Sequence, residues 1–178
     1  MISDDPYLAS LSGNPSISIE MVCLGNICRS PLAAAVLHNK ALDIEAPKIV
    51  VSSSGTSNYH IGEGAHKLSV KTWQKAGYEY DHMARQFSRI SFAERDLILA
   101  MDLTNRAMIL NAAQNEAERA KVFMLRQFDP QLSSINPTSR SGELLQVPDP
   151  WGETIDSYEN VLEMVERAVD GLIARLTE

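Results

Sequence analysis

The chain has 178 residues, two cysteines and a formal net charge of -7, and its length is that of one ordinary domain. The acidic balance argues against sequence-independent binding of nucleic acid, which depends on a basic surface, and no apolar run approaches the roughly 20 residues that a membrane helix needs. Two cysteines cannot build a disulfide scaffold, so we expect a cytoplasmic protein without membrane insertion.

The N-terminal segment differs in character from the rest of the chain. Residues 1–17 are polar and interrupted by Pro6, Gly13 and Pro15, which predicts a flexible leader ahead of a domain that spans residues 18–178. The leader has no basic stretch before an apolar run, so we do not expect it to be a secretory signal.

From residue 18 onward, short apolar runs alternate with amphipathic segments. The predicted strands are residues 18–24, 49–53, 97–101 and 122–125. The predicted helices are residues 30–42, 66–76, 104–120 and 158–176. Residues 129–147 have no periodicity and are expected to form a long loop. This alternation predicts a single-domain α/β fold with a four-stranded, mainly parallel sheet and helices on both faces.

The most informative stretch is VCLGNICRSP, residues 22–31. It lies between the first strand and the first helix, at the edge of an α/β sheet where ligands bind. Gly25 and Asn26 tolerate left-handed backbone, so successive N–H groups can point at one anion. The positive end of the following helix, which Ser30 and Pro31 are expected to start, adds to that attraction. The stretch therefore predicts a phosphate-binding loop.

Two side chains of this loop suggest chemistry as well as binding. A cysteine close to a helix N-terminus and an arginine ionises readily, which makes Cys23 a candidate nucleophile. Arg29 can hold two oxygens of a phosphate group at once. The hydroxyl of Ser30 can either cap the helix or donate a hydrogen bond to the thiolate.

The run VCLGNICRSP resembles the phosphate-binding loop of the low-molecular-weight protein tyrosine phosphatases. Four further segments resemble motifs of that family in the same order: Ser53–Thr56, His82–Gln86, Met101-Asp102 with Asn105, and Asp149-Pro150-Trp151. Together the matches cover residues 18–176. Gly152 departs from the family, which often has a second tyrosine there, and residues 132–147 form a longer segment than the family pattern leads us to expect.

The resemblance implies a protein tyrosine phosphatase that hydrolyses phosphotyrosine and small aryl phosphates through a cysteinyl-phosphate. Cys23 would be the nucleophile, Arg29 the transition-state stabiliser and Asp149 the general acid and base. The implied substrate-binding residues are Leu24, Gly25, Asn26, Ile27, Cys28, Ser30, Tyr59 and Trp151. No metal or organic cofactor is expected, because the loop amides and Arg29 neutralise the phosphate. The expected partners are phosphotyrosine-containing proteins, with a tyrosine kinase as counterpart.

Several residues leave alternatives open. Asp129-Pro130 is a second Asp-Pro pair, but only Asp149 has an aromatic residue two positions later, so Asp149 is the preferred acid. Cys28 is either a small buried hydrophobe or, as the resemblance suggests, a partner for a reversible disulfide with Cys23. Asp102 is expected to cap a helix. The four histidines have no metal-ligand spacing, so solvated or hydrogen-bonded surface roles are expected. For His82 the resemblance leaves open a role in supporting the active site.

Three other functions fit parts of the pattern. An arsenate reductase of the thiol-cascade type needs further cysteines, and none follows Cys28. A phosphocysteine carrier of sugar transport needs neither Arg29 nor an acid such as Asp149. A non-catalytic phosphopeptide-binding module would be expected to lack Cys23 or the acid.

Overall fold

The strands form one sheet in which every neighbouring pair is parallel. The computed structural model describes residues 1–178. The strands are β1 (Ser16–Cys23), β2 (Lys48–Gly55), β3 (Leu97–Ala100) and β4 (Val122–Met124), in the order β2-β1-β3-β4. The α-helices are α1 (Pro6–Ser10), α2 (Arg29–Lys40), α3 (Lys67–Lys75), α4 (Ile90–Glu94), α5 (Leu103–Ala112), α6 (Glu116–Arg119) and α7 (Ile155–Leu176). Short 3-10 helices are η1 (Ile2–Asp4), η2 (Leu125–Phe128) and η3 (Arg140–Leu145). The predicted fold class is confirmed.

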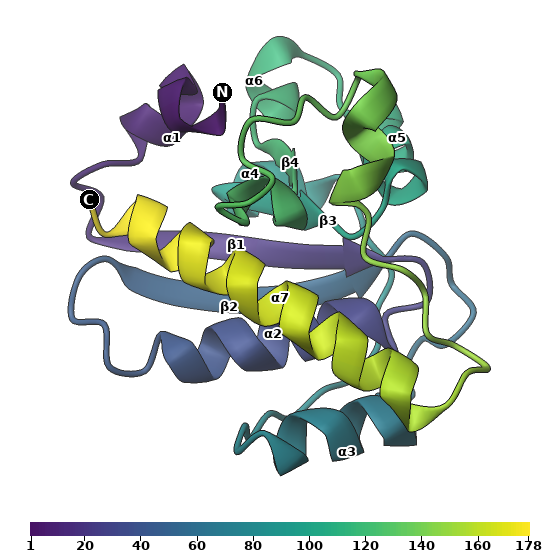
Figure 1. Ribbon diagram of the computed structural model, residues 1–178. Helices are drawn as coiled ribbons and strands as arrows, with labels where there is room; N and C mark the ends of the chain where they lie inside the picture. The colour runs from purple at the N-terminus through teal and green to yellow at the C-terminus, as the bar shows by residue number, and fades with distance from the viewer.

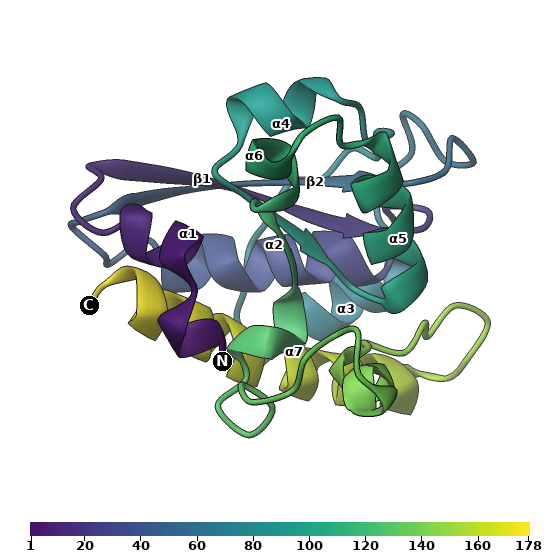
Figure 2. The same cartoon turned by 90° about the horizontal axis from the view of Figure 1, so that it is seen from above.

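Helices cover both faces of the sheet, with α2, α3 and α7 on one side and α4, α5 and α6 on the other (Figures 1 and 2). Alternation along β1 explains the two layers, because successive side chains point to opposite faces. Ile19 and Met21 belong to the core under α2 and α7, whereas Val22 packs with Phe92 and Ile109 on the opposite face. None of the helices is both long and apolar enough to cross a membrane.

The sheet register brings three loops together at one edge. Val22 of β1 pairs with Ala100 of β3, and Cys23 pairs with Gly55 of β2. All three strands therefore end at the same level, as parallel strands in register must. The loop after β1 is consequently flanked by the segments that follow its two neighbours.

The sequence predicts a flexible leader over residues 1–17, whereas the structure has a short helix there, α1. Asp5 caps α1 by accepting hydrogen bonds from the amides of Tyr7 and Leu8. Leu8 and Leu11 are buried in the larger core, and α1 lies beside the C-terminal end of α7 (Figure 1). The hydroxyl of Tyr7 donates to the Asp96 carbonyl over 2.7 Å. The N-terminal segment is thus packed against the domain by two buried side chains, Leu8 of α1 and Leu11 directly after it.

Three other element boundaries differ from the prediction. The helix expected over residues 104–120 is two helices, α5 and α6, and Asn115 caps the second. Leu42 lies beyond the end of α2 and is exposed. The long loop contains η3, and the buried side chains of Leu145 and Val147 attach it to the core.

Candidate active site

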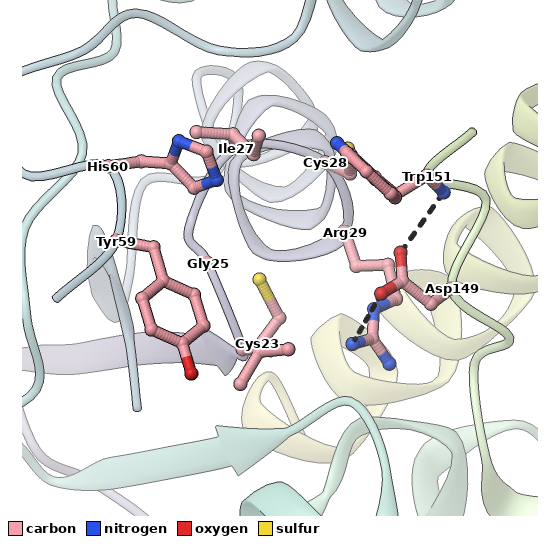
Figure 3. A pocket seen from close by; sticks show the side chains of 10 residues that line it. Cys23, Gly25, Ile27, Cys28, Arg29, Tyr59, His60, Asp149 and Trp151 are labelled. Carbon is pink, nitrogen blue, oxygen red and sulfur yellow. Dashed lines mark hydrogen bonds and ion pairs between the residues drawn. The ribbon is translucent and has the colours of Figure 1, made fainter. Parts of the chain in front are cut away.

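A pocket opens at the carboxyl end of β1, above the loop that leads into α2 (Figure 3). Its lining comes from the loop after β1, the loop after β2 and the segment before α7. The lining residues are Cys23, Leu24, Gly25, Ile27, Cys28, Arg29, Tyr59, His60, Asp149 and Trp151. The structure therefore brings together most of the site residues that the sequence predicted.

The phosphate-binding loop turns at Asn26, which has the left-handed φ of 57° that was expected of this residue type. The Asn26 side chain is buried, and its Nδ2 donates to the hydroxyls of Ser30 (2.8 Å) and Ser53 (2.9 Å). Its backbone N–H donates to Cys23 Sγ over 3.3 Å. Asn26 thus fixes the turn and directs one amide at the sulfur.

The end of β2 approaches this loop closely at Gly55. A Cβ at Gly55 would lie 2.6 Å from the carbonyl oxygen of Leu24, a distance that real Cβ atoms do not show. The amides of Thr56 and Ser57 donate to the carbonyls of Cys23 and Leu24. Glycine is required there so that the two strands can end against each other.

The start of α2 is left free to attract an anion. Cys28 is at the N-cap position, and no side chain caps the helix. The first amides of α2 therefore have no side-chain acceptor and can bind an anion in the pocket. Ser30 does not cap the helix, contrary to one of its two predicted roles. Its Oγ accepts from Asn26 and lies 2.9 Å from Cys23 Sγ and 3.4 Å from the carbonyl oxygen of Ser54. When Cys23 is a thiolate, the sulfur can only accept, so the Ser30 hydroxyl is then the donor.

Arg29 is buried behind the pocket, with 3% of its side chain exposed. Its Nη1 donates to Asp102 Oδ2 over 2.6 Å and to the carbonyl of Val147 over 3.1 Å. Its Nη2 lies 3.6 Å from Asp149 Oδ2. Burial opposes the positive charge, but the neighbouring Cys23, Asp102 and Asp149 outweigh it and raise the pKa of Arg29. The guanidinium is therefore a permanent cation at the base of the pocket.

Asp102 has two functions, of which the sequence indicated one. It caps α5, as predicted, by accepting from the amide of Asn105 over 2.7 Å. Its other carboxylate oxygen accepts from Arg29 and so fixes the direction of the guanidinium. The contact with Arg29 could have been predicted from the position of Asp102 just after β3, because the ends of adjacent parallel strands meet at one edge of the sheet.

The two Asp-Pro pairs lie in different places. Asp149 is at the pocket, 44% exposed, and its Oδ1 accepts from the amide of Trp151 over 3.1 Å. Asp129 is fully buried away from the pocket, where it accepts from Arg167 of α7 over 3.2 Å. Only Asp149 is in a position to exchange protons with a ligand.

Aromatic side chains form the rim on opposite sides. Tyr59 and Trp151 are 70% and 64% exposed and flank the opening (Figure 3). His60, which the sequence did not single out, also lines the pocket, and its Nδ1 lies 2.8 Å from Glu63 Oε2. No motif marks His60, since its place depends on how the loop after β2 folds back over Gly25.

The second cysteine, Cys28, lines the pocket but is almost wholly buried. Burial raises the pKa of Cys28 to about 11, and the hydrogen bond with the Tyr158 hydroxyl, 3.4 Å away, only partly opposes this shift. Cys28 is therefore a neutral thiol near neutral pH. Both cysteines are free thiols in the structure.

His82 is half-buried and lies under the loop, where a role in supporting the active site would place it. Its Nε2 is 2.6 Å from the carbonyl oxygen of Asn26. Burial lowers the pKa of His82, and the hydrogen bond to Asn26 only partly offsets that effect. A neutral His82 thus donates to the loop backbone and supports the turn.

Two predicted substrate-binding residues, Asn26 and Ser30, do not line the pocket with their side chains. Both are fully buried and act within the loop, as described above. No group of three or more His, Cys, Asp or Glu side chains is placed to hold a metal ion.

A cysteine and a buried arginine at a strand–loop–helix junction, with a carboxylic acid opposite, define a site for phosphoryl transfer from a bound phosphate ester. The family model described as "Low molecular weight phosphotyrosine protein phosphatase" matches residues 18–178. The chain belongs to this family, and it is a protein tyrosine phosphatase and thus a hydrolase.

Individual relatives agree with this assignment. A low molecular weight protein-tyrosine-phosphatase of Streptomyces coelicolor is 39% identical over 158 residues, 88% of this chain and 92% of that protein. A protein tyrosine phosphatase of Entamoeba histolytica has a solved structure with a TM-score of 0.78 and 31% identity, covering 90% of this chain and 96% of that one. An arginine phosphatase of Geobacillus stearothermophilus has a TM-score of 0.74 and 28% identity, covering 90% and 92%.

Proposed function

We propose that the enzyme hydrolyses phosphotyrosine in proteins, and small aryl phosphates, through a phosphoryl group carried on Cys23. The observation that supports this most directly is that Cys23, Arg29 and Asp149 line one pocket although they come from two distant parts of the chain. Each has the chemistry that one part of the reaction requires.

In the first step the Cys23 thiolate attacks phosphorus and an S–P bond forms. The P–O bond to the phenol breaks, and Asp149 gives its proton to the departing oxygen. Arg29 and the loop amides bind the equatorial oxygens, whose charge is spread in the transition state. Asp102 and the Val147 carbonyl keep the guanidinium directed toward them.

In the second step Asp149, now a carboxylate, takes a proton from water. The water oxygen attacks phosphorus and the S–P bond breaks. Inorganic phosphate leaves, and Cys23 is again a thiolate. The Ser30 hydroxyl, 2.9 Å from the sulfur, stabilises the thiolate as the leaving group. Proton transfer thus returns Asp149 to its starting state after each turnover.

The walls of the pocket favour an aryl ester. Tyr59 and Trp151 can stack on a ring between them, and Leu24 and Ile27 add apolar surface. The arginine phosphatase among the structural relatives acts on a cationic group, which would require acceptors around the leaving group. Asp149 is the single carboxylate of this pocket, and it faces Arg29. We therefore infer phosphotyrosine as the substrate.

We also infer the cellular compartment of the enzyme and its partners. An acidic chain with two free thiols suits the reducing cytoplasm. The partners would be phosphotyrosine proteins, which requires a tyrosine kinase as the source of the phosphoryl group. The alternatives of arsenate reduction and of non-catalytic phosphopeptide binding are not favoured, because Cys28 is the only further thiol and the acid is present.

The role of Asp149 is tested by its replacement with asparagine. Asp149→Asn is expected to lower kcat/KM for a phosphotyrosine peptide by about a hundredfold or more, which is the usual contribution of a general acid. The loss of kcat/KM, which reports the first step, should be much smaller for p-nitrophenyl phosphate, because its phenolate leaves readily without a proton. In contrast, kcat should fall for both substrates, because both share the second step, in which Asp149 acts as the base. Steady-state kinetics with the two substrates measures this difference.

Asp129→Asn is the matched control, since it changes the other Asp-Pro pair. It removes the charge that faces Arg167 and should lower the thermal stability, with kcat within about twofold of wild type. Equal losses of kcat/KM for both substrates in Asp149→Asn, or a loss of kcat in Asp129→Asn as large as that in Asp149→Asn, would show that the acid has been assigned wrongly.

A further inference from the structure

Glu20 is a charged residue in the middle of the central strand β1, and it is fully buried. It lies on the face of the sheet that carries Val22, whose neighbours Phe92 and Ile98 are apolar. Burying a carboxylate in such a place is costly unless it is paired and hydrogen-bonded. The partners of Glu20 therefore indicate why the charge is there.

Three groups surround the carboxylate. Ser54 of β2 donates its hydroxyl proton to Oε1. Arg85 Nη2 lies 3.3 Å from Oε1, and Arg95 Nε donates to Oε2 over 3.3 Å. Two arginines from the segment before and the segment after α4 thus converge on one buried anion.

Arg85 connects this anion to the phosphate-binding loop. Its Nε donates to the carbonyl of Ser53 over 2.9 Å, and its backbone N–H donates to Asn26 Oδ1, also over 2.9 Å. Asn26 is the residue with the left-handed backbone whose amide points at Cys23 Sγ. A continuous series of polar contacts therefore runs from Glu20 through Arg85 and Asn26 to the nucleophile.

We propose that Glu20 is a positioning residue for the phosphate-binding loop, acting through Arg85 on Asn26. Its carboxylate holds the Arg85 side chain against β2, so that the Arg85 amide stays aligned with the side chain of Asn26. Arg95 neutralises the same carboxylate but has no contact with the loop. The proposal rests on the phosphatase function proposed above.

The test compares Glu20→Gln, Arg85→Gln and Arg95→Gln with the double variant Glu20→Gln/Arg85→Gln. Two readouts are needed: kcat/KM for p-nitrophenyl phosphate, and the dissociation constant of inorganic phosphate measured by calorimetry. Glu20→Gln and Arg85→Gln should each weaken phosphate binding and lower kcat/KM by about tenfold, and the double variant should be little worse than either. Arg95→Gln should lower the unfolding temperature but leave phosphate binding unchanged.

A merely structural role would give a different result. In that case Glu20→Gln and Arg95→Gln would lose thermal stability alike, and both would bind phosphate as wild type does, which would overturn the proposal. Glu20→Leu provides a second variant, since an apolar residue suits this buried site and both arginines can turn toward solvent. If Glu20→Leu folds and binds phosphate normally, the proposal is also overturned. Phosphate binding can be compared even if the wild type hydrolyses nothing, so failure of the proposed function is recognised separately.

Discussion

Replacing Cys23 with serine is expected to reduce hydrolysis of p-nitrophenyl phosphate by about four orders of magnitude or more, as loss of a covalent nucleophile does. Serine is close in size and keeps a polar atom near Ser30, so the fold should be unchanged. A serine hydroxyl, however, ionises far less readily than a thiol and is therefore a much weaker nucleophile. The assay is run at mildly acidic pH with EDTA, and the thermal unfolding temperature is measured alongside.

The matched control is Cys28→Ser, which changes the neighbouring thiol. Cys28 is a neutral thiol bonded to Tyr158, so its replacement should leave kcat within a few-fold of wild type. If Cys23→Ser retained the activity of the wild type, another nucleophile or a contaminant would be responsible. If wild type itself were inactive, the carrier and binding alternatives would gain support over hydrolysis.

Replacing Arg29 with lysine is expected to lower kcat/KM by about a thousandfold, even though the charge is kept. The guanidinium is fixed by Asp102 and the Val147 carbonyl on one nitrogen and leaves the other directed at the pocket. A lysine has one ammonium group and cannot be held from behind while it binds two phosphate oxygens in front. Both kcat and the affinity for inorganic phosphate should therefore fall.

Arg167→Lys controls for a general cost of changing a buried or half-buried arginine. Arg167 pairs with Asp129 away from the pocket, so its replacement should affect stability alone. If kcat/KM of Arg29→Lys stayed within tenfold of wild type, a positive charge alone would be sufficient. The proposed need for a guanidinium that is held on one side and binds phosphate on the other would then be wrong.

The phosphate-binding loop could be predicted because its features are local. A short apolar strand, glycine and asparagine at a turn, and a helix start follow one another within ten residues, so sequence order alone places Cys23 and Arg29 together. Asp149 could be predicted only from its motif, since nothing local indicates that the segment before α7 returns to the end of β1.

Other features depend on contacts between distant segments. Leu8 and Leu11 gave too weak a periodic signal to predict α1, whose burial depends on α7. Asp102 was recognised as a helix cap, but its contact with Arg29 exists only because β1 and β3 are neighbours in the sheet. Glu20 stood in an apolar run, and its partners Arg85 and Arg95 come from loops whose path the sequence does not indicate.

The central claim is that phosphate is transferred to Cys23, and mass spectrometry of a trapped intermediate tests it most directly. Asp149→Asn is mixed with p-nitrophenyl phosphate and quenched in acid during the first turnovers, when slow attack by water should let the intermediate accumulate. Peptide mapping should find one added phosphoryl group on the peptide containing Cys23, and none in Cys23→Ser. A burst of nitrophenol with no phosphoryl group on the protein, or with the group on another residue such as His60, would contradict the account.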